Sequence, residues 1–155
     1  MAANGFDWRY NVSGGRPLIL TFVMKDTETL TRGDMLNIES GEVDLAATGD
    51  AALAGIFVGP ENPEDAVDGK PGTLAGTDST TVVKVIVNPD AVYADANDTS
   101  ARLAGATLDI SGATGAQTVA ASSNTEFVVV ERKRQSSDET RLMICSSAHY
   151  LAKAQ

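Results

Sequence analysis

The chain has 155 residues, enough for one domain that buries roughly 70% of the surface its unfolded form exposes. Its formal charge of −9 opposes contact with the phosphates of nucleic acids, so DNA or RNA binding is not expected. The single cysteine, Cys145, excludes an internal disulfide, and we expect a reducing compartment such as the cytosol. No secretory signal is predicted at the N-terminus, and no apolar run reaches the roughly 20 residues of a membrane span.

The N-terminal segment concentrates three of the eight aromatic residues of the chain. Phe6, Trp8 and Tyr10 alternate, so an extended strand would place all three side chains on one face. We predict that residues 1–15 form an extended arm that docks on a partner or a neighbouring subunit, because aromatic anchors dominate the energy of interfaces. The residues expected at that contact are Phe6, Trp8, Arg9 and Tyr10. The alternative is an edge strand laid on the domain's own core.

Residues 16–155 contain short runs rich in β-branched and aliphatic residues, each bounded by residues that favour turns. The predicted strands are Leu18–Met24, Met35–Ile38, Gly55–Val58, Thr80–Val87, Glu126–Glu131 and Arg141–Cys145. Thr80–Val87 is almost continuously apolar, which indicates a central strand covered on both faces. Helix is expected to be a minor element, with Asn97–Leu103 as its best candidate. The predicted fold class is all-β, a compact β-barrel or sandwich in residues 16–155.

Three polar segments are predicted to be a loop, a turn and the start of a strand, and the loop Glu61–Gly72 could be mobile until it touches a partner. Glu61–Gly72 is acidic and rich in proline and glycine, which favours a surface loop. The basic cluster Arg132-Lys133-Arg134 lies between two apolar runs, so we predict the solvated turn of a hairpin. Arg32-Gly33-Asp34 spells a tripeptide known for cell adhesion, but such short matches arise by chance, and a strand is expected to start there.

An acidic stretch follows the predicted central strand. Its side chains with oxygen ligands for a cation are Asp90, Asp95, Asn97 and Asp98. A calcium loop needs a glycine at its sharp turn and a bidentate glutamate at its end. If the count begins at Asp95, Ser100 and Ala106 stand at those two places. We therefore expect an acidic connection between strands, with a cation site outside the known motif as the alternative.

Neither of the two residues best suited to nucleophilic chemistry lies in a catalytic motif. His149 is the only histidine, and we expect it to be partly buried or on the surface, without a catalytic role. Cys145 continues the alternation of Leu142-Met143-Ile144, so an inert core thiol is expected. Gly69–Thr73 lacks the spacing of a phosphate-binding loop. The chain is predicted not to be an enzyme, with no catalytic, cofactor-binding or metal-binding residues.

Two parts of the chain resemble small head proteins of tailed bacteriophages. The first comprises Leu30–Leu36, Ala46–Gly49 and Leu53–Gly59, and the second comprises Val83–Pro89, Ala101–Ile110 and Ser122–Val130. Their order and style look like those of a head decoration, or cement, protein of the β-tulip type, over most of residues 16–155. That family has no fixed functional residue, so no single residue is carried over from it.

The resemblance implies a barrel that is made in the host cytoplasm and assembles as a homotrimer on the outer surface of an expanded capsid. There it would contact the major capsid protein and stabilise the shell against internal DNA pressure, without nucleic acid, membrane or cofactor. Two alternatives stay open. One is another virion component, such as a fibre base. The other is a small β-barrel enzyme or ligand-binding module acting near His149 or the Asp95–Asp98 loop.

Overall fold

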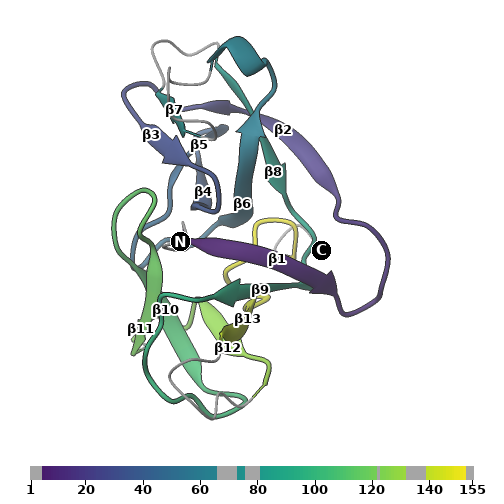
Figure 1. Ribbon diagram of the computed structural model, residues 1–155, viewed down its shortest axis with the longest axis vertical. Coiled ribbons are helices and arrows are strands. Elements are labelled where there is room, and N and C mark those ends of the chain that lie inside the picture. The colour runs from purple at the N-terminus through teal and green to yellow at the C-terminus, as the bar shows by residue number, and fades with distance from the viewer. Residues whose placement is uncertain (1–4, 66–72, 76–80, 122, 132–138, 153–155) are drawn as a thin grey trace.

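The computed structural model describes residues 5–65, 73–75, 81–121, 123–131 and 139–152, which form an almost entirely β structure (Figure 1). The predicted all-β class and the predicted barrel are confirmed. In chain order the elements are β1 (Phe6–Asn11), β2 (Ile19–Met24), β3 (Thr29–Thr31), β4 (Met35–Glu39), β5 (Glu42–Leu45), β6 (Leu53–Pro60), the 3-10 turn η1 (Pro63–Asp65), β7 (Thr73–Ala75), β8 (Val82–Ile86), β9 (Ala91–Asp95), β10 (Thr107–Ser111), β11 (Thr118–Ala121), β12 (Phe127–Val129) and β13 (Thr140–Ile144).

The upper half of the molecule in Figure 1 is a closed barrel in the strand order β2-β5-β4-β6-β8. β2 and β5 run parallel, and the other neighbours run antiparallel. Alternate side chains of these strands point inward, as the two-residue period of a strand requires. Those that are buried in the barrel core are Met24, Leu36, Val43, Ala54, Phe57, Val83 and Val85, and the same core includes Leu30 of β3 and Val87, which follows β8.

The lower half is an antiparallel sheet in the order β1-β9-β13-β12-β10-β11 (Figure 1). Its core also takes residues from the outer face of the barrel, such as Met35, Ile56 and Ile86. Barrel strands β4, β6 and β8 therefore contribute to two cores. Val85 points into the barrel and Ile86 into the second core, so the prediction that this strand is covered on both faces is confirmed at these residues.

β1 is an edge strand of this sheet, paired antiparallel with β9. The Phe6 side chain is fully buried, and its ring stacks on that of Phe127 with the centroids 5.7 Å apart. The edge-strand alternative thus describes residues 6–11, and a separate arm does not, because Phe6 fills the core of the sheet. Residues 1–4 lie outside the described residues.

A β-bulge in β1 changes the direction of its third aromatic side chain. Trp8 pairs with Tyr93, whereas Tyr10 pairs with Val92, so the register shifts between them. Cross-strand partners share a face of a sheet, and Tyr93 and Val92 are adjacent in β9. Trp8 and Tyr10 therefore lie on opposite faces, and the prediction of one aromatic face is wrong for Tyr10.

Every predicted strand overlaps an observed one, but several strands had not been expected. The most informative is β9, because all five of its residues are buried although it lies in the acidic stretch. The helical turn predicted at Asn97–Leu103 is wrong: the described chain there has bends and an isolated bridge. η1 begins the predicted loop at Glu61–Gly72, whose residues 66–72 lie outside the described part of the chain, as does the basic cluster at 132–134.

Candidate functional site

The acidic stretch is held by hydrogen bonds that the protein itself supplies. Asp95 ends β9 and is fully buried. One of its oxygens accepts the N–H groups of Asn97 (2.8 Å) and Asp98 (3.2 Å), and the other accepts the Thr118 hydroxyl (2.7 Å) and the Val119 N–H (3.0 Å). Burial raises the pKa of Asp95, and these donors oppose the rise. The carboxylate shapes the turn after β9 and ties that turn to β11.

Asp98 forms a second buried connection. Its carboxylate pairs with the Arg102 guanidinium at 2.9 Å, and it accepts the Thr140 hydroxyl at 2.7 Å and the Ser100 N–H at 3.1 Å. Burial acts to raise the pKa of Asp98, but the bonds from Arg102 and Thr140 outweigh it and leave the pKa lowered. The Asp98 side chain thus makes a local hydrogen bond to the backbone two residues further on, as in an Asx turn.

The four predicted oxygen ligands do not meet at one point. Asp90 lies at the other end of β9, where it accepts the Ser13 N–H at 2.8 Å, and its contacts with Ser13 lower its pKa. The Asn97 amide donates to the Gln117 carbonyl at 3.2 Å. Within the described ranges, no three histidine, cysteine, aspartate or glutamate side chains are grouped so that they could hold a metal ion.

A shallow groove of about 360 Å³ lies beside this loop. It is lined by Asn97, Asp98, Thr99, Ser100, Arg102 and residues 118–121 of β11. Its lining combines polar side chains of the loop with the apolar residues Val119, Ala120 and Ala121, and the Arg102 charge that borders it is paired with Asp98. The groove therefore presents an ion pair to a ligand, with the carboxylate already bound by the protein.

Buried polar side chains also join the barrel to the sheet. Asp34 accepts the N–H groups of Thr31 and Gly115 and the Thr114 hydroxyl, at 2.6 to 2.8 Å. Burial raises the pKa of Asp34, and these bonds oppose the rise. Since Asp34 and Gly33 are buried, Arg32-Gly33-Asp34 does not form an accessible adhesion motif.

Gln117 makes the most central of these connections. Its side chain is fully buried. Its carbonyl oxygen accepts the Met35 N–H at 2.6 Å, and its amide donates to the carbonyls of Met35 (3.3 Å) and Ala46 (3.0 Å). Glu126 works in the same way, since its carboxylate accepts the N–H groups of Ile110 and Gly49. These contacts fix the orientation of the barrel on the sheet.

His149 is fully buried, whereas it was expected to be only partly buried or on the surface. Its Nδ1 accepts the Leu151 N–H at 3.1 Å, and burial lowers its pKa to about 4. A histidine held neutral in this way acts here as a part of the core. Its ring stacks on that of Tyr150, with the ring centroids 5.5 Å apart.

Cys145 was expected in the core but is half-buried. It directly follows β13, in which Leu142 and Ile144 are the buried residues. The side chains alternate as predicted, but Cys145 lies on the opposite face from the one expected. It shares the less buried face with Met143. Burial still raises the pKa of the thiol, which favours the neutral form.

The predicted contact residues of the N-terminal segment do not form one surface. Phe6 is fully buried. Trp8 is half-buried and its indole donates to Asn11 at 3.1 Å, whereas Arg9 is exposed and pairs with Glu139. Tyr10 lies on the opposite face and reaches Glu131 at 3.5 Å. A partner contact through Trp8, Arg9 or Tyr10 stays a prediction, while Phe6 is not accessible to a partner.

An exposed apolar strip at the start of β2 and in the connection that precedes it was not predicted. It comprises Val12, Leu18, Ile19 and Leu20, of which 61%, 45%, 47% and 37% are exposed. The last two begin β2, and residues 17–24 carry no charge. The apolar run lies within the predicted strand Leu18–Met24, but the sequence pattern does not indicate that its first residues are exposed. Contiguous exposed apolar side chains mark contact surfaces.

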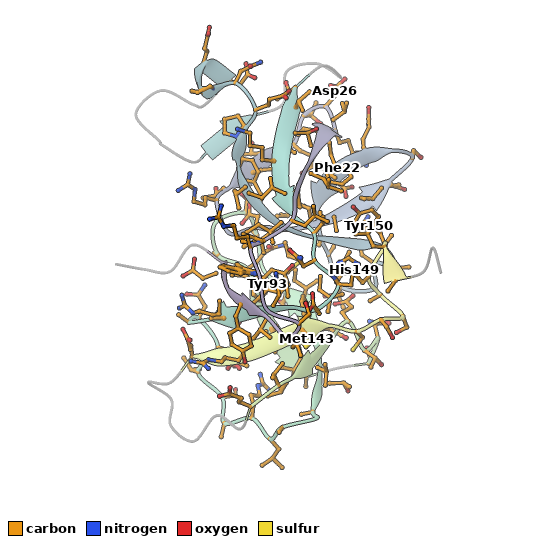
Figure 2. The ribbon with its side chains drawn as sticks, turned by 90° about the vertical axis from the view of Figure 1, so that its right-hand side faces the viewer. Phe22, Asp26, Tyr93, Met143, His149 and Tyr150 are labelled. Carbon is orange, nitrogen blue, oxygen red and sulfur yellow. The ribbon has the colours of Figure 1, made fainter. Side chains whose placement is uncertain are left out.

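C-terminal to the strip, β2 meets aromatic residues, of which Phe22 and Tyr150 are half-buried and His149 is fully buried. In Figure 2, Phe22, Tyr150 and His149 follow one another down the same side of the molecule. The rings of Phe22 and Tyr150 meet edge to face, with their centroids 5.8 Å apart. The part of β2 that packs against the C-terminal segment is therefore covered, and the exposed part lies N-terminal to Phe22.

No family model matches the chain, and no curated protein matches it. In the part of the chain that the structure describes, no helix has the length and apolar character needed to cross a bilayer.

Proposed function

We propose that this chain is a structural virion protein that binds the outer surface of an expanded tailed-phage capsid. In several copies it stabilises the shell against the pressure of packaged DNA. The resemblance of its sequence to head decoration proteins suggests this role. The observation that carries the proposal is the exposed, uncharged strip at Val12 and Leu18–Leu20, since such a strip on an acidic protein suits adhesion to another protein chain.

The internal construction of the protein supports the same role. Buried polar side chains such as Asp34 and Gln117 join the barrel to the sheet, and the two share core residues. A body tied together in this way transmits force between contacts on its two ends without coming apart. A protein that reinforces a shell under pressure needs that property.

Association in several copies is part of the proposal. By the resemblance, the partners are the major capsid protein and the chain itself in a homotrimer. Linked copies present the same weak contact several times, which strengthens overall binding by roughly 10² to 10⁴. The charge of −9 keeps the free protein soluble before it docks. No catalytic step is included in the proposed function.

The test is binding to heads of the phage that encodes the chain. Purified protein would be mixed with expanded, DNA-free heads and with unexpanded heads, pelleted by ultracentrifugation and imaged by electron microscopy. We expect added density on the outside of expanded heads, and greater resistance of those heads to heat. Heads that gain neither density nor heat resistance would contradict the proposal.

A further inference from the structure

The N-terminal half of β2 leaves one edge of the barrel without a neighbour. β8 pairs with β2 from Ile19 to Val23, but β5 covers the opposite edge only from Val23 onward. The barrel seam between β2 and β5 therefore has no paired strand at Ile19–Thr21 in the described part of the chain, while the Phe22 ring is covered by Tyr150. An exposed strand edge of this kind is a template for pairing with another strand.

The backbone hydrogen bonds show which peptide groups face that open edge. The Leu18 carbonyl accepts the Val87 N–H at 3.0 Å, and the Met24 N–H donates to the Thr81 carbonyl at 2.8 Å. Both residues thus direct their peptide groups toward β8. Peptide groups alternate in direction along an antiparallel strand. Those of Ile19 and Thr21 therefore point to the open edge.

We propose that this edge pairs antiparallel with the same edge of a second copy of the chain. A twofold axis at Leu20 places Ile19 opposite Thr21 of the other copy, so each N–H donates to the carbonyl of the residue that faces it. Leu20 then lies against Leu20 of the second copy. The exposed apolar side chains of the two edges cover one another.

Charge selects a second copy as the occupant. Residues 17–24 carry no charge, in a chain whose net charge is −9. Two identical edges therefore meet without like charges directly opposite each other, and a charged partner segment finds no counter-charge on this edge. The side chains are also self-complementary, because the residues that the twofold axis brings together are all apolar except Thr21.

This pairing does not depend on the proposed capsid role, and its test needs no capsid. It joins copies two at a time. If another surface holds the chain in a homotrimer, each trimer presents three such edges, and the pairing joins neighbouring trimers.

The test is a charge exchange at the twofold axis. Leu20→Lys and Leu20→Asp each place like charges opposite one another in the pair, whereas an equimolar mixture of the two variants places opposite charges there. Sedimentation velocity over a range of concentrations measures the mass of each sample. Leu103→Lys is the matched control, since Leu103 is 66% exposed and lies outside β2.

We expect the wild-type mass to double with rising concentration, and each Leu20 variant to weaken that association at least about tenfold. The mixture should restore the doubling, and Leu103→Lys should leave it unchanged. Melting curves identify variants that fail to fold, and for these Thr21→Pro, which removes an N–H from the open edge, replaces the charge variant. A wild-type mass that never doubles, a doubling that persists in the variants, or a mixture that stays undoubled would overturn the pairing.

Discussion

At the scale of single residues, burial rather than reactivity explains the ionisable groups of the interior. Asp34, Asp95 and Glu126 all have pKa values raised by burial and opposed by hydrogen bonds from the protein. His149 is buried with a pKa lowered to about 4. These side chains hold turns and join sheets, so their effects are expected in the stability of the fold.

His149 predicts a dependence of stability on pH. Its pKa is about 4 in the folded chain and about 6.5 in the unfolded chain, so only the unfolded chain binds the proton between these values. Burial of the neutral His149 therefore leaves the folded chain at its full stability above about pH 6.5. That stability decreases as the pH falls from 6.5 toward 4. The slope of the free energy of unfolding is at most about 1.4 kcal/mol per pH unit.

Urea titrations at several pH values would measure that slope in the wild type and in His149→Asn, which keeps an acceptor for the Leu151 N–H. Protonation of the carboxyls with raised pKa values works in the opposite direction, and it contributes equally to both proteins. The difference between the two proteins therefore isolates His149. Parallel curves for the two proteins would contradict the assignment.

The backbone at Gly55 leaves no room for a larger residue at this position. Its φ is +137°, and an added Cβ would lie 1.7 Å from the Ile86 carbonyl oxygen. Gly55→Ala should cost about 3 kcal/mol or more of unfolding free energy, since the contact is with backbone. Gly49→Ala is the control, because Gly49 also has a positive φ of +94° but open space at its Cβ. Equal losses in the two variants, measured by urea unfolding, would show that backbone strain alone is responsible.

At the scale of elements, β1 should contribute to the stability of the fold as well as to any contact. Phe6→Ala removes a fully buried ring that stacks on Phe127, so we expect a loss of about 3–5 kcal/mol. Asp7→Ala, at an exposed position of the same strand, should change the free energy of unfolding by less than about 0.5 kcal/mol. A Phe6→Ala protein as stable as the wild type would show that β1 is dispensable.

The sequence allowed some elements to be predicted and concealed others for physical reasons. β8 was predictable because a short, nearly continuous apolar run rich in β-branched residues is typical of a strand covered on both faces. β9 was concealed because it is flanked by acidic residues, and only the fold supplies the donors that allow Asp95 to be buried. The direction of Tyr10 depends on a bulge, and no local residue pattern indicated it.

At the scale of the whole molecule, the barrel was predictable from the sequence but its association with a second sheet was not. The alternation of apolar residues in the sequence indicates where strands form. The open edge of β2 depends instead on the residue at which its pairing with β5 begins. The apolar side chains of the strip were visible in the sequence, and their exposure was not. That exposure is decided by a neighbour that is distant in the chain.

The shared core predicts that the barrel and the sheet unfold together. Met35 and Ile86 belong to barrel strands and pack in the core of the sheet, and Gln117 bonds to backbone groups of both Met35 and Ala46. The only tryptophan, Trp8, reports on β1, whereas far-UV circular dichroism reports on all strands. The two signals should change at the same urea concentration, as for a two-state domain.

Gln117→Ala would leave the Met35 N–H and the Ala46 carbonyl buried without this partner, at a cost of about 1–3 kcal/mol for each unsatisfied group. Because these groups lie where the barrel meets the sheet, both signals should move to lower urea together. Thr107→Ala, at an exposed position of β10, is the control and should leave the midpoint unchanged. If the Trp8 signal changed well before circular dichroism in the wild type, the sheet would be an independent unit, and force on one half would not be shared by the other.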